Sequence, residues 1–265
     1  MRNPVKVIWI LNLVQGAKQS IMKKDIKINN QISATLITPK KIPKPLPALL
    51  FIHGWRSNRT GNVKRAKELA KHGFISLCID LRGHGESPTT SLQKNAKQSQ
   101  KLEDFSRKDH IEDIKNAYQY LKNLENVDKE KIGIIGASYG GYLSAVAVNY
   151  LKFNKLVLRV PALYFDNNFD VPTDKLIKGD PKAFKTSNLT PQNSLALKGL
   201  KNFKGKILII EAENDTVIPH EVIENYRHFT NPKKNKYVLM SSTPHSFETE
   251  AQEEAYLYIL KHWLD

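Results

Sequence analysis

The chain has 265 residues, 40% of them hydrophobic, and a formal net charge of +15. This length suits one large domain, and the sequence lacks the linkers, repeats and low-complexity tracts that would divide it. The excess charge comes mainly from lysines, which are spread along the chain without a run of five. Because nucleic-acid sites more often show clustered arginines and aromatic residues, we expect no nucleic-acid partner.

The first residues resemble a short signal sequence, with an apolar stretch at 7–14 behind Arg2 and Lys6. This stretch is far shorter than the roughly 20 residues of a membrane helix, so we expect no stable membrane insertion. Residues 15–17 match a signal-peptidase site poorly. We therefore predict an N-terminal extension over residues 1–21 and a cytoplasmic protein, with export as the alternative if residues 1–17 act as a signal.

The only cysteine, Cys78, excludes an intrachain disulfide. It lies in an apolar segment, FISLCID, and is therefore expected in the core. No pair of cysteines or histidines has the spacing of a metal site, so neither a metal nor an organic cofactor is predicted. Nothing in the sequence predicts the oligomeric state.

Short apolar segments alternate with amphipathic ones along the chain. This alternation predicts an α/β fold with a mostly parallel, twisted central sheet and helices on both faces. Ser106 is predicted to be the N-cap of the second helix. The expected strands are one or two edge strands over 26–38, then 47–52, 74–80, 131–137, 155–160, 206–212 and 236–240, and the expected helices lie near 62–72, 106–124, 139–150, 220–229 and 250–263.

One segment interrupts this alternation. Residues 161–205 are rich in prolines and show weak patterning. Because 45 residues are too many for a plain connection in a compact sheet, we expect a short cap insertion over about 161–205. The main domain is then residues 22–265, with this cap inside it.

The turn from Gly136 to Gly140 has the pattern G-x-S-x-G, with Ser138 at its centre. An apolar strand precedes it and a helical segment follows, so the serine hydroxyl is expected to lie exposed on a sharp strand-to-helix turn. The small glycines would let the strand and the helix approach closely. The pattern predicts that Ser138 is a nucleophile; a tight structural turn is the alternative.

A serine hydroxyl needs a base to take its proton, and the base needs an acid partner. His245 follows a late strand and precedes the last helix, which is the place expected for the base. Asp215 follows the strand over 206–212 and is the preferred acid. Along the chain the three residues then follow in the order nucleophile, acid and base, which is expected when the serine lies on such a strand-to-helix turn. The rival carboxylates are Glu211, Glu213 and Asp180.

Two backbone N–H groups should face the oxyanion of the reaction. The N–H of Tyr139 directly follows the nucleophile, and the N–H of Trp55 lies in the turn His53-Gly54-Trp55 after an early strand. For this turn, too, a purely structural role is the alternative. The side chains expected to bind substrate in an acyl or aromatic pocket are Trp55, Tyr139, Tyr164 and Phe165.

Five motifs in the same order resemble the α/β-hydrolase superfamily from about residue 26 onward, and the nucleophile turn is similar to that of prolyl-oligopeptidase-like hydrolases. The resemblance implies a scaffold role for Asp80, Arg82 and His84. It also implies hydrolysis of an acyl bond through a serine acyl-enzyme, and we predict a single-domain serine esterase for a small-molecule ester. Because the predicted cap is short, we expect short or medium acyl groups. The motifs are HGW at 53–55, DLRGHGES at 80–87, GASYGG at 136–141, ENDTVIP at 213–219 and PHSF at 244–247.

Three other functions stay open. A serine peptidase or aminopeptidase for short peptides would need a group that captures a terminal amine or carboxylate, for which Arg56 and Arg59 are candidates. A thioesterase or acyltransferase would use the same three residues. A non-catalytic binding protein is the least favoured, because a strained nucleophile turn without a use lowers stability.

Overall fold

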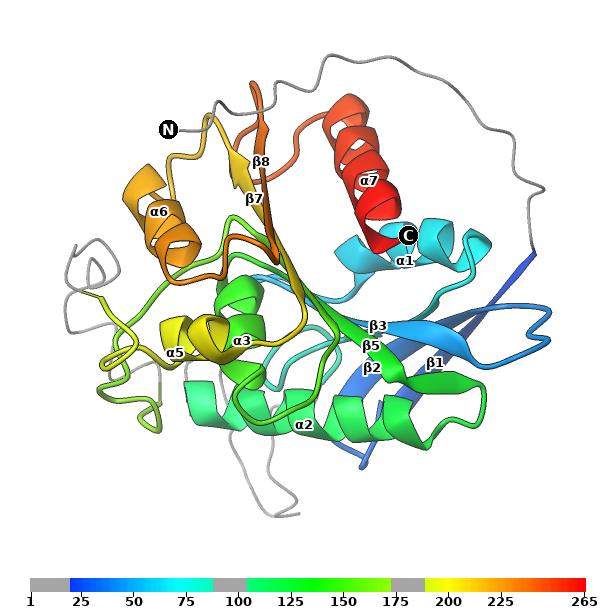
Figure 1. Ribbon diagram of the computed structural model, residues 1–265. Coiled ribbons are helices and arrows are strands. Elements are labelled where there is room, and N and C mark those ends of the chain that lie inside the picture. The colour runs from blue at the N-terminus through cyan, green and yellow to red at the C-terminus, as the bar shows by residue number, and fades with distance from the viewer. Residues whose placement is uncertain (1–19, 88–103, 173–188) are drawn as a thin grey trace.

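In the computed structural model, which describes residues 20–87, 104–172 and 189–265, one twisted sheet of eight strands crosses the molecule (Figure 1). The strand order is β1-β2-β4-β3-β5-β6-β7-β8. β2 pairs antiparallel with β1 and β4, and all other neighbours are parallel. The strands are β1 (Ile21–Ile28), β2 (Ile32–Pro39), β3 (Leu46–Ile52), β4 (Ile75–Ile79), β5 (Val127–Ala137), β6 (Lys155–Arg159), β7 (Lys206–Ala212) and β8 (Asn235–Met240).

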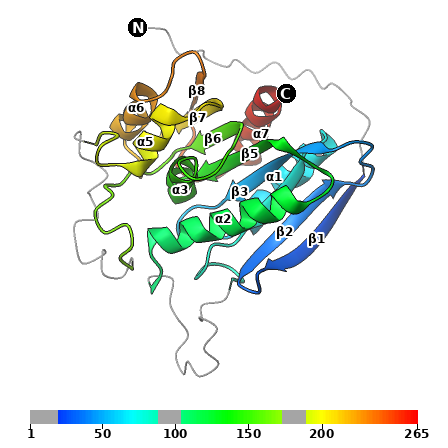
Figure 2. The ribbon, with the colours of Figure 1, turned by 60° about the horizontal axis from the view of Figure 1, so that its bottom comes forward.

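Helices cover both faces of the sheet (Figures 1 and 2). Alternate strand residues point to opposite faces, so Leu50 of β3 joins the core under one helix layer and Phe51 joins the other. α2 (Arg107–Asn123), α3 (Tyr139–Ala147), α5 (Leu195–Asn202) and α6 (His220–His228) cover the first face, and α1 (Thr60–Lys71) and α7 (Glu250–Leu264) cover the second.

These features confirm the predicted fold class, with differences at the element ends. Residues 26–38 form parts of two strands, joined at Asn29 and Asn30, whose positive φ angles of 50° and 56° asparagine tolerates. β5 starts at Val127 instead of residue 131. The prediction missed its first residues because exposed charged side chains there hide the apolar pattern. α3 ends at Ala147, three residues before the predicted end.

Local predictions for the second helix and for Cys78 are also confirmed. Ser106 caps α2: its Oγ accepts a hydrogen bond from the Asp109 N–H, and the Asp109 carboxylate accepts one from the Ser106 N–H at 2.9 Å. Such a capping box satisfies two donors that the helix itself leaves without partners. Cys78 is fully buried in β4.

The described part of the predicted cap consists of a loop after β6 and of α5. α5 packs closely on α3, since a Cβ at Gly199 would lie 2.2 Å from the Ala145 carbonyl oxygen. Residues 173–188 lie outside the described residues, so the cap over the strand ends stays a prediction. The apolar stretch at 7–14 lies outside them as well. Among the described residues, the helices are too short or too polar to cross a membrane.

Candidate active site

Ser138 stands between β5 and α3 in a backbone conformation that side chains rarely adopt, with φ 54° and ψ −120°. The neighbouring glycines explain how this turn is built. A Cβ at Gly136 would lie 2.2 Å from the Gly140 carbonyl oxygen. One at Gly140 would lie 2.4 Å from the carbonyl oxygens of Ile52 and His53, at the end of β3. The crowded backbone therefore requires glycine, and the turn places Ser138 at the N-terminus of α3, where the helix dipole favours negative charge.

The structure brings the three predicted residues together. His245 Nε2 lies 3.1 Å from Ser138 Oγ, and His245 Nδ1 lies 2.7 Å from Asp215 Oδ2. Both distances are within hydrogen-bond range. Ser138 follows β5, Asp215 follows β7 and His245 follows β8, so the three side chains meet at the carboxyl edge of the sheet, as expected for parallel strands.

The Asp215 carboxylate is held on its other oxygen by the turn that leads to α6. Oδ1 accepts hydrogen bonds from the N–H groups of Val217 and Ile218, at 2.8 and 2.9 Å. Burial alone would raise the pKa of Asp215, but the hydrogen bonds from His245, Ile218 and Val217 outweigh it and lower the pKa below its ordinary value. The carboxylate is therefore charged at neutral pH.

The rival acids are placed elsewhere. Glu211 is bound to other partners, with its carboxylate 2.7 Å from His220 Nδ1 and 2.5 Å from the Tyr237 hydroxyl. Glu213 accepts a hydrogen bond from the Ser242 N–H. Asp180 lies outside the described residues.

The turn predicted to supply one oxyanion donor lies against the nucleophile. A Cβ at Gly54 would be 3.5 Å from both the Ser138 Cβ and the Ala137 carbonyl oxygen. The half-buried ring of Trp55 packs edge-on against the ring of Tyr139, with centroids 5.1 Å apart. The backbone of Trp55 therefore runs beside the start of α3; its role as a donor stays a prediction.

The predicted pocket residues differ in their exposure. The Tyr139 side chain is only 3% exposed, and its hydroxyl lies 2.8 Å from His110 Nδ1. Tyr164 stacks edge-on against Tyr142 at 4.8 Å and is partly buried. Phe165 is partly buried too, and its carbonyl accepts a hydrogen bond from Arg107. The aromatic rings thus form a packed layer near Ser138, and their contact with substrate stays a prediction.

Sequence reasoning missed Arg159, the last residue of β6. Its side chain is 7% exposed and stacks on the Phe247 ring, with the guanidinium carbon 3.8 Å from the centroid. One guanidinium nitrogen donates to the His245 carbonyl at 2.6 Å, while the Arg159 carbonyl accepts from the Ser138 N–H. Burial lowers the pKa of Arg159 to about 10, so the side chain is charged at neutral pH. Arg159 therefore connects the loop of His245 to the turn of Ser138.

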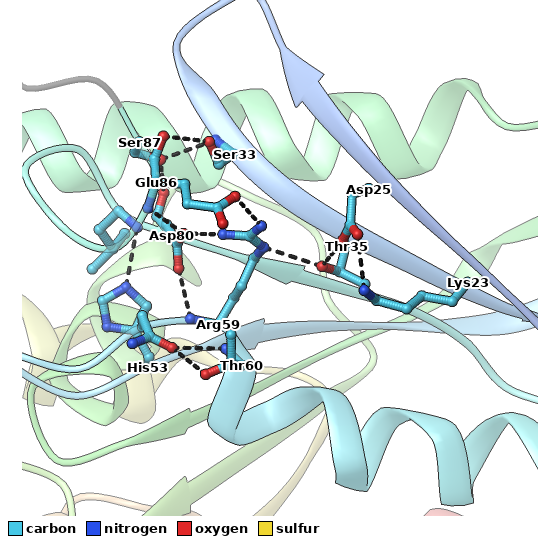
Figure 3. Close-up of polar contacts among 12 residues, drawn as sticks. Lys23, Asp25, Ser33, Thr35, His53, Arg59, Thr60, Asp80, Glu86 and Ser87 are labelled. Carbon is cyan, nitrogen blue, oxygen red and sulfur yellow. Dashed lines mark hydrogen bonds and ion pairs between the residues drawn. The ribbon is translucent and has the colours of Figure 1, made fainter.

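The segment Asp80–Ser87 has a bracing role, as the resemblance implied for Asp80. Figure 3 shows that the Asp80 carboxylate binds the Arg59 side chain and accepts hydrogen bonds from the N–H groups of Arg59 and Glu86. The Arg59 side chain also reaches Thr35 and Glu86. Arg59 is thus engaged within the fold and is not available to capture a peptide terminus, which corrects one expectation for the peptidase alternative. Arg56 is exposed at the surface.

Two histidines behind this segment are buried and neutral. Nε2 of His53 accepts from the Leu81 N–H, while its Nδ1 faces the Gly54 carbonyl. His110 lies between the Tyr139 hydroxyl and the Arg82 carbonyl. Burial is the largest cause that lowers the pKa values of His53 and His110, to about 4 and about 3. Both side chains are therefore part of the packed structure that supports the site.

We expect this burial to make the protein less stable in mild acid. The unfolded chain takes up a proton on each histidine near pH 6.5, whereas the folded chain does not until a much lower pH. The contribution of each buried histidine to the free energy of unfolding is therefore present above pH 6.5 and is lost as the pH falls below it. Between pH 7 and 5 the loss is about 2 kcal/mol per histidine. Urea unfolding of His110→Gln at both pH values should show a pH dependence smaller by about this amount.

Tyr139→Phe is the matched control, because it removes the hydrogen bond to His110 and keeps the histidine buried. Its unfolding free energy should depend on pH as strongly as that of the wild type. The burial account fails if His110→Gln leaves the pH dependence of the unfolding free energy unchanged.

A comparison with protein families finds a match to the alpha/beta hydrolase fold over residues 47–192. Human dipeptidyl peptidase 8 is 34% identical over 113 residues, which are 40% of this chain and 12% of that protein. A Bradyrhizobium protein named "Probable 2-oxo-3-(5-oxofuran-2-ylidene)propanoate lactonase" is 27% identical over 124 residues, 46% of this chain and 49% of that protein. The matches thus span half or less of each curated relative.

Solved structures agree with the fold. A dienelactone hydrolase from Anabaena variabilis superposes with a TM-score of 0.63 and 18% identity, over 93% of this chain and 97% of that one. An acetyl xylan esterase from a Paenibacillus species gives a TM-score of 0.64 and 19% identity, over 95% and 87%. At these identities the likeness extends to the arrangement of the strands and helices.

Proposed function

The chain belongs to the α/β-hydrolase family, and we propose that it is a hydrolase, specifically a serine esterase for small or medium acyl groups. The observation that carries the proposal is the continuous chain of hydrogen bonds from Ser138 through His245 to Asp215. A hydroxyl, an imidazole and a carboxylate in this order are the groups that nucleophilic acyl transfer requires.

In the proposed acylation step, Ser138 Oγ attacks the ester carbonyl while His245 Nε2 takes the hydroxyl proton. Asp215, held by the two N–H groups of its turn, keeps the other ring N–H of His245 pointing toward itself and stabilises the imidazolium. His245 then gives the proton to the departing alcohol oxygen, and the acyl group stays on Ser138.

In deacylation, His245 takes a proton from water, and the resulting oxygen nucleophile attacks the acyl carbon. The carbon–oxygen bond to Ser138 breaks, Oγ regains the proton, and the acid leaves. The N–H groups of Tyr139 and Trp55 are the proposed donors to the oxyanion in both steps, supported by their place beside Ser138 and by the positive end of α3.

A peptidase is the second candidate, favoured by the likeness to dipeptidyl peptidase 8. The likeness to the lactonase favours the esterase, because a lactone is a cyclic ester. Two observations argue against the peptidase. The match covers 12% of the peptidase, and Arg59 is engaged by Asp80 and Glu86.

A panel of p-nitrophenyl esters, matched thioesters and aminoacyl p-nitroanilides tests the proposal. We expect kcat/KM to be highest for acetyl to hexanoyl esters and at least tenfold lower for the thioesters and anilides. Preference for an aminoacyl anilide would replace the esterase with the peptidase. Turnover confined to long-chain triglycerides would contradict the predicted acyl length.

We expect Arg159 to act as a positioning residue for His245. Arg159→Met should lower kcat roughly ten- to a hundredfold with little change in KM, because the His245 carbonyl loses its donor and the loop is free to shift away from Ser138. Arg159→Lys should recover part of kcat, and added guanidinium should recover part of it in Arg159→Met. Steady-state kinetics on one ester measures all three. An unchanged kcat with a lowered melting temperature would make Arg159 purely structural.

A further inference from the structure

A groove with a volume of about 990 Å³ lies at the end of the sheet opposite Ser138. Its walls include Leu46, Lys155, Lys206 and Asn235, the first residues of β3, β6, β7 and β8. The proposed catalytic residues follow the carboxyl ends of β5, β7 and β8. Because a strand of five to seven residues spans roughly 15–25 Å, the groove and the candidate active site are separate.

Lysines dominate the lining of this groove, which we call the lysine groove. They come from five segments that are far apart in the sequence, so their clustering appears only in the fold. Among the described residues that line the groove, Asp265 is the only acidic one. The lysines are Lys44, Lys131, Lys155, Lys204, Lys206, Lys233, Lys234 and Lys236.

Three of these lysines have partners within the protein. Lys131 forms an ion pair with Asp128 at 3.3 Å, Lys155 donates to the Leu264 carbonyl, and Lys234 donates to the Lys204 carbonyl at 2.6 Å. Within residues 20–87, 104–172 and 189–265, no carboxylate forms an ion pair with the other five. These five residues are exposed and line the groove.

Two of these lysines are close enough for their charges to interact. Burial, and then the charge of Lys206, lower the pKa of Lys155, while the charge of Asp265 acts in the opposite direction. Clustered like charges in a concave surface concentrate the field and attract counter-ions of opposite sign. Phe74 and Trp263 add apolar surface, and Lys155 Nζ lies 5.6 Å from the Trp263 ring centroid. The groove thus combines uncompensated ammonium groups with an apolar wall.

We propose that the lysine groove binds a small molecule of nucleotide size that carries two or more phosphate groups. Lysine ammonium groups bind phosphates as point charges, and several phosphates would neutralise several of them at once. The volume lies within the range of small-molecule sites, about 300–1,000 Å³. The apolar wall suits a ring or another uncharged part of the ligand.

Calorimetric titration of the full chain with ATP, tripolyphosphate and adenosine tests this proposal. At 50 mM salt we expect one ATP or one tripolyphosphate per chain, with a Kd below about 100 μM, and no binding of adenosine. Raising the salt to 200 mM should weaken binding, because the attraction is electrostatic. ATP should bind more tightly than tripolyphosphate if the apolar wall contributes.

The double variant Lys206→Gln/Lys236→Gln should weaken the binding of ATP at least tenfold. The control double variant Lys24→Gln/Lys27→Gln removes the same charge from exposed positions on β1, at the far edge of the sheet. It should weaken the binding of ATP less than twofold. Thermal unfolding in the absence of ligand checks that both double variants fold.

Three results would overturn the proposal. The first is the absence of saturable binding, and the second is equal weakening by both double variants, which would mean diffuse surface charge. The third is a single-stranded oligonucleotide that binds tenfold more tightly than ATP, which would make the groove a nucleic-acid site. None of these results depends on the esterase proposal.

Discussion

Ser138→Ala should lower kcat for the preferred ester by about 10⁴- to 10⁶-fold while the protein stays folded. The side chain at this position has no packing role that alanine cannot fill, and alanine, like serine, must accept a φ of 54° there. What is lost is the oxygen that His245 Nε2 approaches at 3.1 Å. Residual turnover would come from the oxyanion donors and substrate binding alone. Steady-state kinetics measures the loss, and circular dichroism checks the fold.

Ser144→Ala is the matched control, because Ser144 lies on α3, the helix that Ser138 precedes, and its buried hydroxyl donates to the Gly140 carbonyl. Losing that hydrogen bond should lower stability by about 1 kcal/mol and leave kcat within a few-fold of wild type. If Ser138→Ala retained near-wild-type turnover, another group would have to be the nucleophile, and the proposed mechanism would be wrong.

Asp215→Asn should lower kcat by about 10³- to 10⁴-fold. The N–H groups of Val217 and Ile218 both donate to Asp215 Oδ1. The asparagine carbonyl oxygen would keep these two bonds and so place its NH₂ group, a donor, against His245 Nδ1. The imidazole would then carry its proton on Nε2 and could not take the proton of Ser138. Kinetics on the preferred ester, with KM measured separately, tests this.

Glu211→Gln is the control for this prediction, since Glu211 is the rival acid from the same strand. Its carboxylate binds His220 and Tyr237, so the variant should keep kcat within about tenfold of wild type. A large loss in Glu211→Gln together with a small loss in Asp215→Asn would move the role of the acid to Glu211.

The sequence predicts the sheet and the meeting of Ser138, Asp215 and His245, because each follows an apolar strand and parallel strands end at one edge. It predicts the start of β5 poorly, since exposed charges there mask the pattern. Arg159 gives no signal in the sequence: a charged residue at the end of a strand is ordinary, and only the fold shows that it is buried against the loop of His245.

The lysine groove could not be predicted for a related reason. Lys44, Lys155, Lys206 and Lys236 are separated by tens of residues, and each alone is an ordinary surface lysine. The strand order places the starts of β3, β6, β7 and β8 along one edge of the sheet, and only that arrangement gathers the charges.

Labelling with a fluorophosphonate, followed by mass spectrometry of the digested protein, tests the central claim most directly. The reagent reacts with serines that a neighbouring base activates, so the account predicts one modified residue, Ser138, with loss of ester hydrolysis in proportion to labelling. Ser138→Ala should take up no label. Label on a different residue, or full esterase activity in protein that carries label on Ser138, would contradict the account.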